Sequence, residues 1–164
     1  KQQVKTADTS SPRGTLTLFL DSGNALYELI QKQRYYERDD PEGQRIANRI
    51  VSCLDTSQLP EYARAYYATE AAACLKEVLD RVPLPPAEAI PGIENVRTAD
   101  GSTPVLLWQV PGTQITINRI QDGPRAGEFL FSTETVTQAR EMYAKVQSLP
   151  YRTDGRPVSK GLYK

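Results

Sequence analysis

The 164-residue sequence contains no histidine, and this absence excludes several classes of chemistry. Imidazole-based catalytic triads, the common zinc sites and histidine acid–base catalysis all need that side chain. The only two cysteines, Cys53 and Cys74, form no CxxC pair, so neither a metal cluster nor a thioredoxin-like redox site is supported. We therefore expect no metal ion and no other cofactor.

The sequence also lacks an excess of either charge and lacks long hydrophobic runs. Lys plus Arg number 20 and Asp plus Glu number 20, so the formal net charge is zero. Non-specific nucleic-acid binding needs a basic surface, and we expect no nucleic-acid partner. No stretch approaches the ~18 consecutive apolar residues of a transmembrane helix, and no signal peptide is visible. The start at Lys1 rather than Met suggests a mature or excised form.

The polar and apolar patterns divide the chain into one domain with two flanking segments. Residues 1–11 are polar and aperiodic, so we expect them to be disordered. Residues 12–150 form the single domain. Residues 151–164 contain two glycines and a proline, and we expect an exposed C-terminal tail.

Proline and capping residues mark three helices in the first half of the domain. Ser11-Pro12 and Asp40-Pro41 each place a capping side chain before a proline at the first helical position. The first pair opens a helix over about 12–34, and Pro60 opens a third helix with the most regular apolar stripe. Pro83, Pro85 and Pro86 then end the third helix, because proline has no backbone amide hydrogen to donate.

Two further features predict close packing between segments. Gly23 costs the first helix ~1 kcal/mol unless another element packs against it. Residues 83–92 have the composition of a polyproline-type strap, either a ligand for a proline-reading module or an internal connector. We favour the connector, because Leu84 and Ile90 can anchor it to the domain.

After the turn pair Asp100-Gly101, the spacing of apolar residues changes from the helical repeat of about 3.6 to the alternating repeat of a strand. Strands over 105–110, 113–120 and 128–131, joined by short turns, predict an antiparallel meander. A closing helix follows, capped by Ser132. The fold class is therefore α+β, with three N-terminal helices, a three-stranded antiparallel β-meander and a C-terminal helix.

The glycine-rich stretch at 122–127 lies between two of these strands. A phosphate-binding loop instead lies between a strand and a helix N-terminus, where backbone amides point at the anion. We therefore interpret Gly123 and Gly127 as hairpin glycines at positions of positive φ.

Candidate reactive groups each have a structural explanation. We expect Cys53 and Cys74 to be free and buried, because antiparallel helices would hold them too far apart for a disulfide. A carboxylate cluster lacks the spacing of a calcium loop and lies at a helix N-terminus, where acids are expected. Its members are Glu37, Asp39, Asp40 and Glu42.

Four residues are the candidates for ligand binding: Trp108, Tyr67, Arg119 and Arg125. Trp108 and the tyrosines could line a cleft between the meander and the helices, although aromatic residues at such spacing are more often core. The arginines flank the hairpin tip and could contact an acidic partner. The sequence holds no recognisable catalytic residues, and we expect a protein that is not an enzyme; carboxylates brought together by folding are the remaining enzymatic route.

Three stretches together resemble one known family: "SPRGTLTLFLDSGNALYELI" at 11–30, "CLDTSQLPEYARAYYATEAAACLKEVLDRVPLPP" at 53–86, and "VPGTQITINRIQDGPRAGEFLFSTETVTQAREMYAKVQSLPYR" at 110–152. Their order is similar to that in the N-terminal extramembrane domain of bacterial small-conductance-type mechanosensitive channels. In that family the domain precedes transmembrane helices, a pore and a cytoplasmic vestibule, none of which is represented here.

The resemblance implies a non-catalytic domain on the periplasmic side of the inner membrane, with a regulatory, assembly or partner-binding role. Implied partners are the transmembrane and pore region of the same polypeptide, further copies in a homo-oligomer, and an envelope protein or small solute. The alternative is a stand-alone periplasmic module that binds a small ligand.

Overall fold

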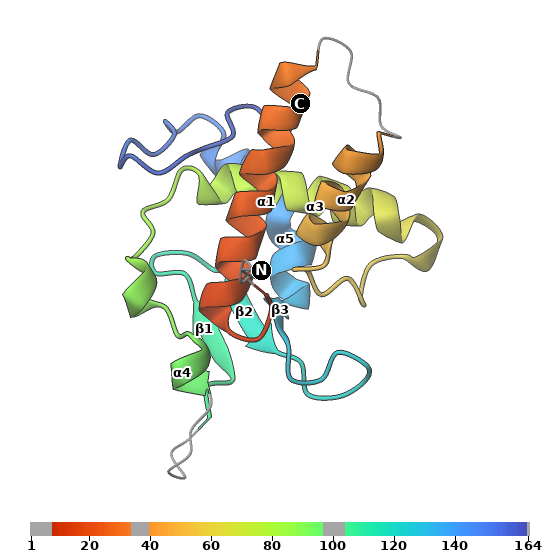
Figure 1. Ribbon diagram of the computed structural model, residues 1–164, viewed down its shortest axis with the longest axis vertical. Coiled ribbons are helices and arrows are strands. Elements are labelled where there is room, and N and C mark those ends of the chain that lie inside the picture. The colour runs from red at the N-terminus through yellow and green to blue at the C-terminus, as the bar shows by residue number, and fades with distance from the viewer. Residues whose placement is uncertain (1–7, 34–39, 97–103, 164) are drawn as a thin grey trace, which may run out of the picture.

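The computed structural model describes residues 8–33, 40–96 and 104–163 of the chain. These described residues have an α+β fold with five α-helices and one three-stranded antiparallel sheet, which confirms the predicted class. Figure 1 shows α1 (Pro12–Lys32) upright across the molecule, with α3 (Arg64–Leu79) crossing it and the small sheet at its N-terminal end. The turn expected at Asp100-Gly101 lies outside the described residues.

The helices begin where capping side chains satisfy free backbone amides. Ser11 accepts a hydrogen bond from the Gly14 amide at the start of α1, and Asp40 accepts one from Gly43 in α2 (Pro41–Val51). Ser132 caps α5 (Thr133–Val146), as expected. Pro60 is followed by a 3₁₀ turn (Glu61–Ala63) before α3 begins.

The strap after α3 contains structure that the sequence did not predict. A 3₁₀ turn (Ala87–Ala89) and the short helix α4 (Ile93–Val96) lie between α3 and the sheet. Ile90 is buried and Leu84 packs against the core, so both expected anchors are confirmed.

The sheet is the predicted meander in the order β1 (Leu107–Gln109), β2 (Thr116–Arg119), β3 (Phe129–Phe131). In the β2–β3 connection Gly123 and Gly127 have φ values of +86° and +92°, which confirms the hairpin interpretation. Strand register places Trp108 opposite Ile117, and Ile117 opposite Phe131, so these three side chains share the core-facing side.

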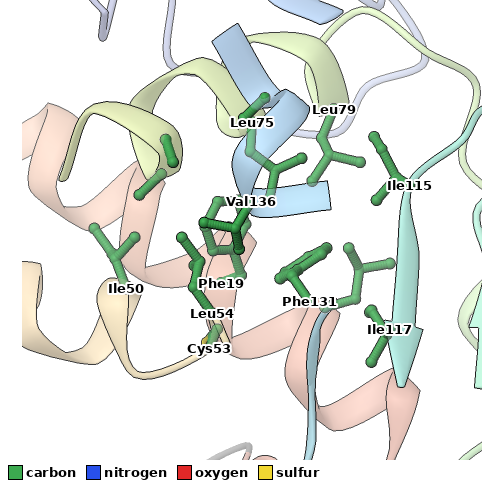
Figure 2. Packing of buried hydrophobic residues seen from close by; sticks show 14 of the residues in the cluster. Phe19, Ile50, Cys53, Leu54, Leu75, Leu79, Ile115, Ile117, Phe131 and Val136 are labelled. Carbon is green, nitrogen blue, oxygen red and sulfur yellow. The ribbon is translucent and has the colours of Figure 1, made fainter. Parts of the chain in front are cut away.

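The core lies between this face of the sheet and the helices (Figure 2). Phe19 of α1 meets Phe131 edge to face, with ring centroids 4.9 Å apart. α3 is the central helix: every residue from Cys74 to Leu79 is buried. Such all-round burial forces α3 to bury polar side chains as well as its apolar stripe.

The two flanking segments differ from the sequence-based expectation. Residues 1–7 lie outside the described part, but in residues 8–11 the Thr9 carbonyl accepts a bond from the Phe129 amide. The C-terminal segment, residues 151–163, is not an exposed tail, since Ser159 is fully buried against α3. Charged groups on α3 hold this segment, and composition alone does not reveal such partners.

Candidate functional site

The four candidate ligand residues lie on separate parts of the fold. Tyr67 is in the first turns of α3, where its ring contacts Tyr66 with centroids 5.4 Å apart. Trp108 is in β1, partly buried against the core. Figure 1 shows the start of α3 and β1 on opposite sides of the molecule, so the structure does not bring the two side chains together.

The two candidate arginines are near the hairpin tip, but Arg125 is engaged within the chain. Its guanidinium binds both Glu128 carboxylate oxygens, at 3.0 and 2.8 Å, and donates to the Ser52 carbonyl at 2.8 Å. Its hydrogen bonds to the Glu128 carboxylate raise the pKa of Arg125. Arg125 therefore fastens the hairpin to the end of α2, while Arg119 lies at the end of β2.

The remaining sequence candidates also have structural roles. Both cysteines are free and buried, as predicted. Burial raises the pKa of Cys53 to about 12 and that of Cys74 to about 11, so neither is a ready nucleophile. Asp40 caps α2; Glu37 and Asp39 lie outside the described residues.

Among the described residues, the densest set of buried charges lies in the last turn of α3 and the two residues that follow it. We call it the α3 charge cluster: Lys76, Glu77, Asp80 and Arg81. The first three side chains are at most 1% exposed. Lys76 pairs with Asp80, and Glu77 with Arg81, each one helical turn apart and each with a shortest N–O distance of 2.7 Å. The two ion pairs therefore interleave along a single stretch of helix.

Lys76 joins three parts of the chain through its ammonium group. The Nζ donates to both Asp80 carboxylate oxygens, to Asn24 of α1 at 2.8 Å and to the Ser159 hydroxyl at 3.1 Å. Its aliphatic stem crosses α1 at Gly23, where an added Cβ would be 2.8 Å from Lys76 Cε. The close approach expected at Gly23 is thus made by a lysine. Burial lowers the pKa of Lys76.

Asp80 is the anchor of this half of the cluster. Besides Lys76, its carboxylate accepts from the Ser159 amide at 2.9 Å and from the Ser159 hydroxyl at 3.0 Å. Arg152 approaches it at 3.5 Å, and the Arg152 amide donates to the Asp80 carbonyl at 2.7 Å. A buried carboxylate needs such partners, because desolvation without them is very unfavourable.

Glu77 has an equally complete set of partners. It accepts from Arg81 at 2.7 Å, from the Tyr151 hydroxyl at 2.6 Å and from the Tyr163 amide at 3.0 Å. Burial alone would raise the pKa of Glu77, but these hydrogen bonds outweigh it and the pKa lies below its usual value. Arg81 also stacks over the Tyr151 ring, 4.0 Å from the centroid.

The contact between Ser159 and Lys76 has the composition of a serine–lysine nucleophile pair, but its geometry does not suit catalysis. The Ser159 hydroxyl accepts from the ammonium and donates to Asp80, and Ser159 and Lys76 are both almost completely buried. A general base must be able to accept the proton of the nucleophile, and a substrate must reach that nucleophile. The cluster instead binds residues 151–163 of its own chain.

Sequence reasoning missed this cluster, although part of its signal is visible. The stretch Lys76-Glu77 followed by Asp80-Arg81 contains two charge pairs at i,i+4 inside an apolar stripe. Charges in that position need partners from elsewhere in the fold. The partners in the C-terminal segment are more than 70 residues away along the chain, and spacing does not identify them.

The chain matches no protein-family model, no curated protein and no solved structure. Across residues 8–33, 40–96 and 104–163, no helix has both the length and the apolar character required to cross a bilayer. Within the same described ranges, no group of three or more Cys, Asp or Glu side chains is arranged to hold a metal ion.

Proposed function

We propose that this chain is a non-catalytic periplasmic domain of a small-conductance-type mechanosensitive channel, with a regulatory, assembly or partner-binding role. The proposal begins from the sequence resemblance over 11–30, 53–86 and 110–152. In that family the domain precedes the transmembrane helices, so residues 151–163 would lie between the folded core and the membrane region. The transmembrane and pore region of the same polypeptide is then the first partner.

The observation that best supports a mechanical role is the docking of residues 151–163 onto α3. Asp80 and Glu77 each bind this segment through at least two hydrogen bonds. While these hydrogen bonds are formed, the docked segment moves together with the domain. Any contact of the domain with an envelope protein, a solute or a further copy would therefore act on the connector as well.

A tethered domain changes channel gating only if it interacts differently with the closed and open states. The test is a patch recording of the full polypeptide beside a version without residues 12–150, together with a measurement of subunit assembly. We expect the shortened version to keep a conducting pore but to change its pressure threshold or its assembly. Indistinguishable thresholds and assembly would count against the proposed role.

A simpler observation tests the channel context itself. The coding sequence after Lys164 should contain several apolar segments of about 20 residues, one of them with closely spaced small residues. A coding sequence without such segments would contradict the proposal. The stand-alone ligand-binding alternative would then be tested by thermal-shift screening, with Trp108→Ala as the control.

A further inference from the structure

The C-terminal segment, residues 151–163, contacts α3 through two arms that are joined by an exposed loop. The first arm is Tyr151-Arg152 and the second is 159–163; between them, residues 153–157 are exposed. Figure 1 shows this segment looping out from the body of the molecule and returning to it. Apart from a hydrogen bond from the Arg156 guanidinium to the Pro85 carbonyl at 3.0 Å, the loop is exposed, and the arms provide the contacts with α3.

Each of two α3 carboxylates holds both arms at once. Glu77 accepts from the Tyr151 hydroxyl of the first arm and from the Tyr163 amide of the second. Asp80 is approached by Arg152 of the first arm and bound by Ser159 of the second. The Tyr151 hydroxyl also accepts from the Gly161 amide at 2.8 Å, which ties the arms to each other. The contacts are thus shared, and weakening one should loosen both arms together.

The second arm also covers a thiol. Cys74 is fully buried in the core cluster, and Tyr163 packs against that cluster. The Tyr163 hydroxyl donates to Glu70 at 3.1 Å, and Tyr163 influences the pKa of the Cys74 thiol, so the two side chains are neighbours. The Tyr163 ring packs edge to face on Tyr143, with centroids 5.1 Å apart. Cys53 is in a different place, at the end of α2 in the apolar core (Figure 2). One cysteine therefore lies beneath the segment, and the other lies within the core.

We propose that residues 151–163 form a releasable clasp on α3. The clasp opens as a unit while the helices and the sheet remain folded, and its opening uncovers Cys74 but not Cys53. Its attachment consists largely of hydrogen bonds to two carboxylates rather than of a continuous apolar face, and few buried apolar contacts are typical of segments that open locally. This inference concerns the chain itself and does not depend on the channel proposal.

The test measures the rate at which each cysteine reacts with a maleimide in native buffer, with the two sites quantified separately by peptide mass spectrometry. In the wild-type protein we expect Cys74 to react faster than Cys53. Equal rates would mean that both thiols react only after global unfolding, and this result would overturn the proposal. The comparison requires no substitution, so it does not depend on whether a variant folds.

A conservative variant then tests the mechanism of opening. Tyr151→Phe keeps the ring beneath Arg81 but removes the hydroxyl that joins Glu77 and Gly161. We expect Cys74 to be labelled about tenfold faster or more, the effect of losing a hydrogen bond to a charged group, with Cys53 unchanged. The matched control is Tyr143→Phe, which keeps the ring contact with Tyr163 and should leave both rates as in the wild type. An unchanged Cys74 rate in Tyr151→Phe, or a parallel rise of both cysteines, would overturn the proposal.

Discussion

Replacing Asp80 by asparagine tests the energetic importance of the α3 charge cluster. Asn has nearly the same volume as Asp, so the substitution removes the charge without leaving a cavity. It leaves the Lys76 ammonium, which is 1% exposed, without the anion that binds it through two oxygens at 2.7 Å. The amide also places an NH₂ donor near the donors of Ser159.

The expected loss follows from the burial of the pair. Removing one partner of a buried ion pair destabilises a protein by about 3–5 kcal/mol, because the other charge stays buried and uncompensated. Domains of this kind have a total stability of about 5–15 kcal/mol. At about 2–4 °C per kcal/mol for a chain of this length, Asp80→Asn should lower the melting temperature by roughly 6–20 °C.

The assay is thermal and urea unfolding followed by circular dichroism, with Asp154→Asn as the matched control. Asp154 is on the same C-terminal segment and pairs with Arg152, but its side chain is 40% exposed, so we expect little change there. A melting temperature of Asp80→Asn as high as that of the control would refute the reasoning. The double variant Lys76→Met with Asp80→Asn should be less destabilised than the sum of the single variants, since it removes the orphaned charge.

Three further predictions concern the acid response of Glu77 and the two glycines Gly127 and Gly23. The folded-state pKa of Glu77 lies below its ordinary value, so the stabilisation that its carboxylate contributes is present above the unfolded pKa of about 4.3 and is lost as the pH falls through the folded pKa. In urea titrations, the stability difference between wild type and Glu77→Gln should therefore shrink as the pH falls below about 4.3. A difference that stays constant with pH would contradict this prediction. Gly127→Ala should lower the free energy of unfolding in urea by about 1 kcal/mol, because Gly127 has a φ of +92° that disfavours a side chain, although no neighbouring atom would contact the added methyl group. Gly23→Ala should lower it by about 1–3 kcal/mol, because the added methyl group would overlap the Lys76 side chain, which Asp80 holds in place. Stabilisation by Gly23→Ala would show that Lys76 moves aside freely.

Local signals in the sequence were sufficient to predict most of the elements. Ser11, Asp40 and Ser132 are capping residues whose effect depends on the next three residues, and the alternation around Ile117 belongs to a single strand. The close approach at Gly23 was also predictable, because a glycine inside an apolar helix needs a packing reason. The identity of the neighbour, a lysine from α3, was not.

The candidate site was decided by contacts that are distant in sequence. Trp108 and Tyr67 are both aromatic residues on regular elements, but β1, which carries Trp108, and the start of α3, which carries Tyr67, lie on opposite sides of the molecule (Figure 1). The segment 151–163 is polar and rich in turn residues, which in isolation is typical of an exposed tail. Its docking depends on the Glu77 and Asp80 carboxylates, which lie far away along the chain.

The sequence by itself determined the order of the main helices and strands and the starts of α1, α2 and α5, because caps, prolines and glycines act on the backbone within a few residues. Only the tertiary structure decided that α3 is buried on all sides from Cys74 to Leu79, and that Glu77 and Asp80 take their partners from residues 151–163. A charge inside a folded protein must find a partner wherever the chain brings one. That pairing is a property of three-dimensional packing, which no short stretch of residues encodes.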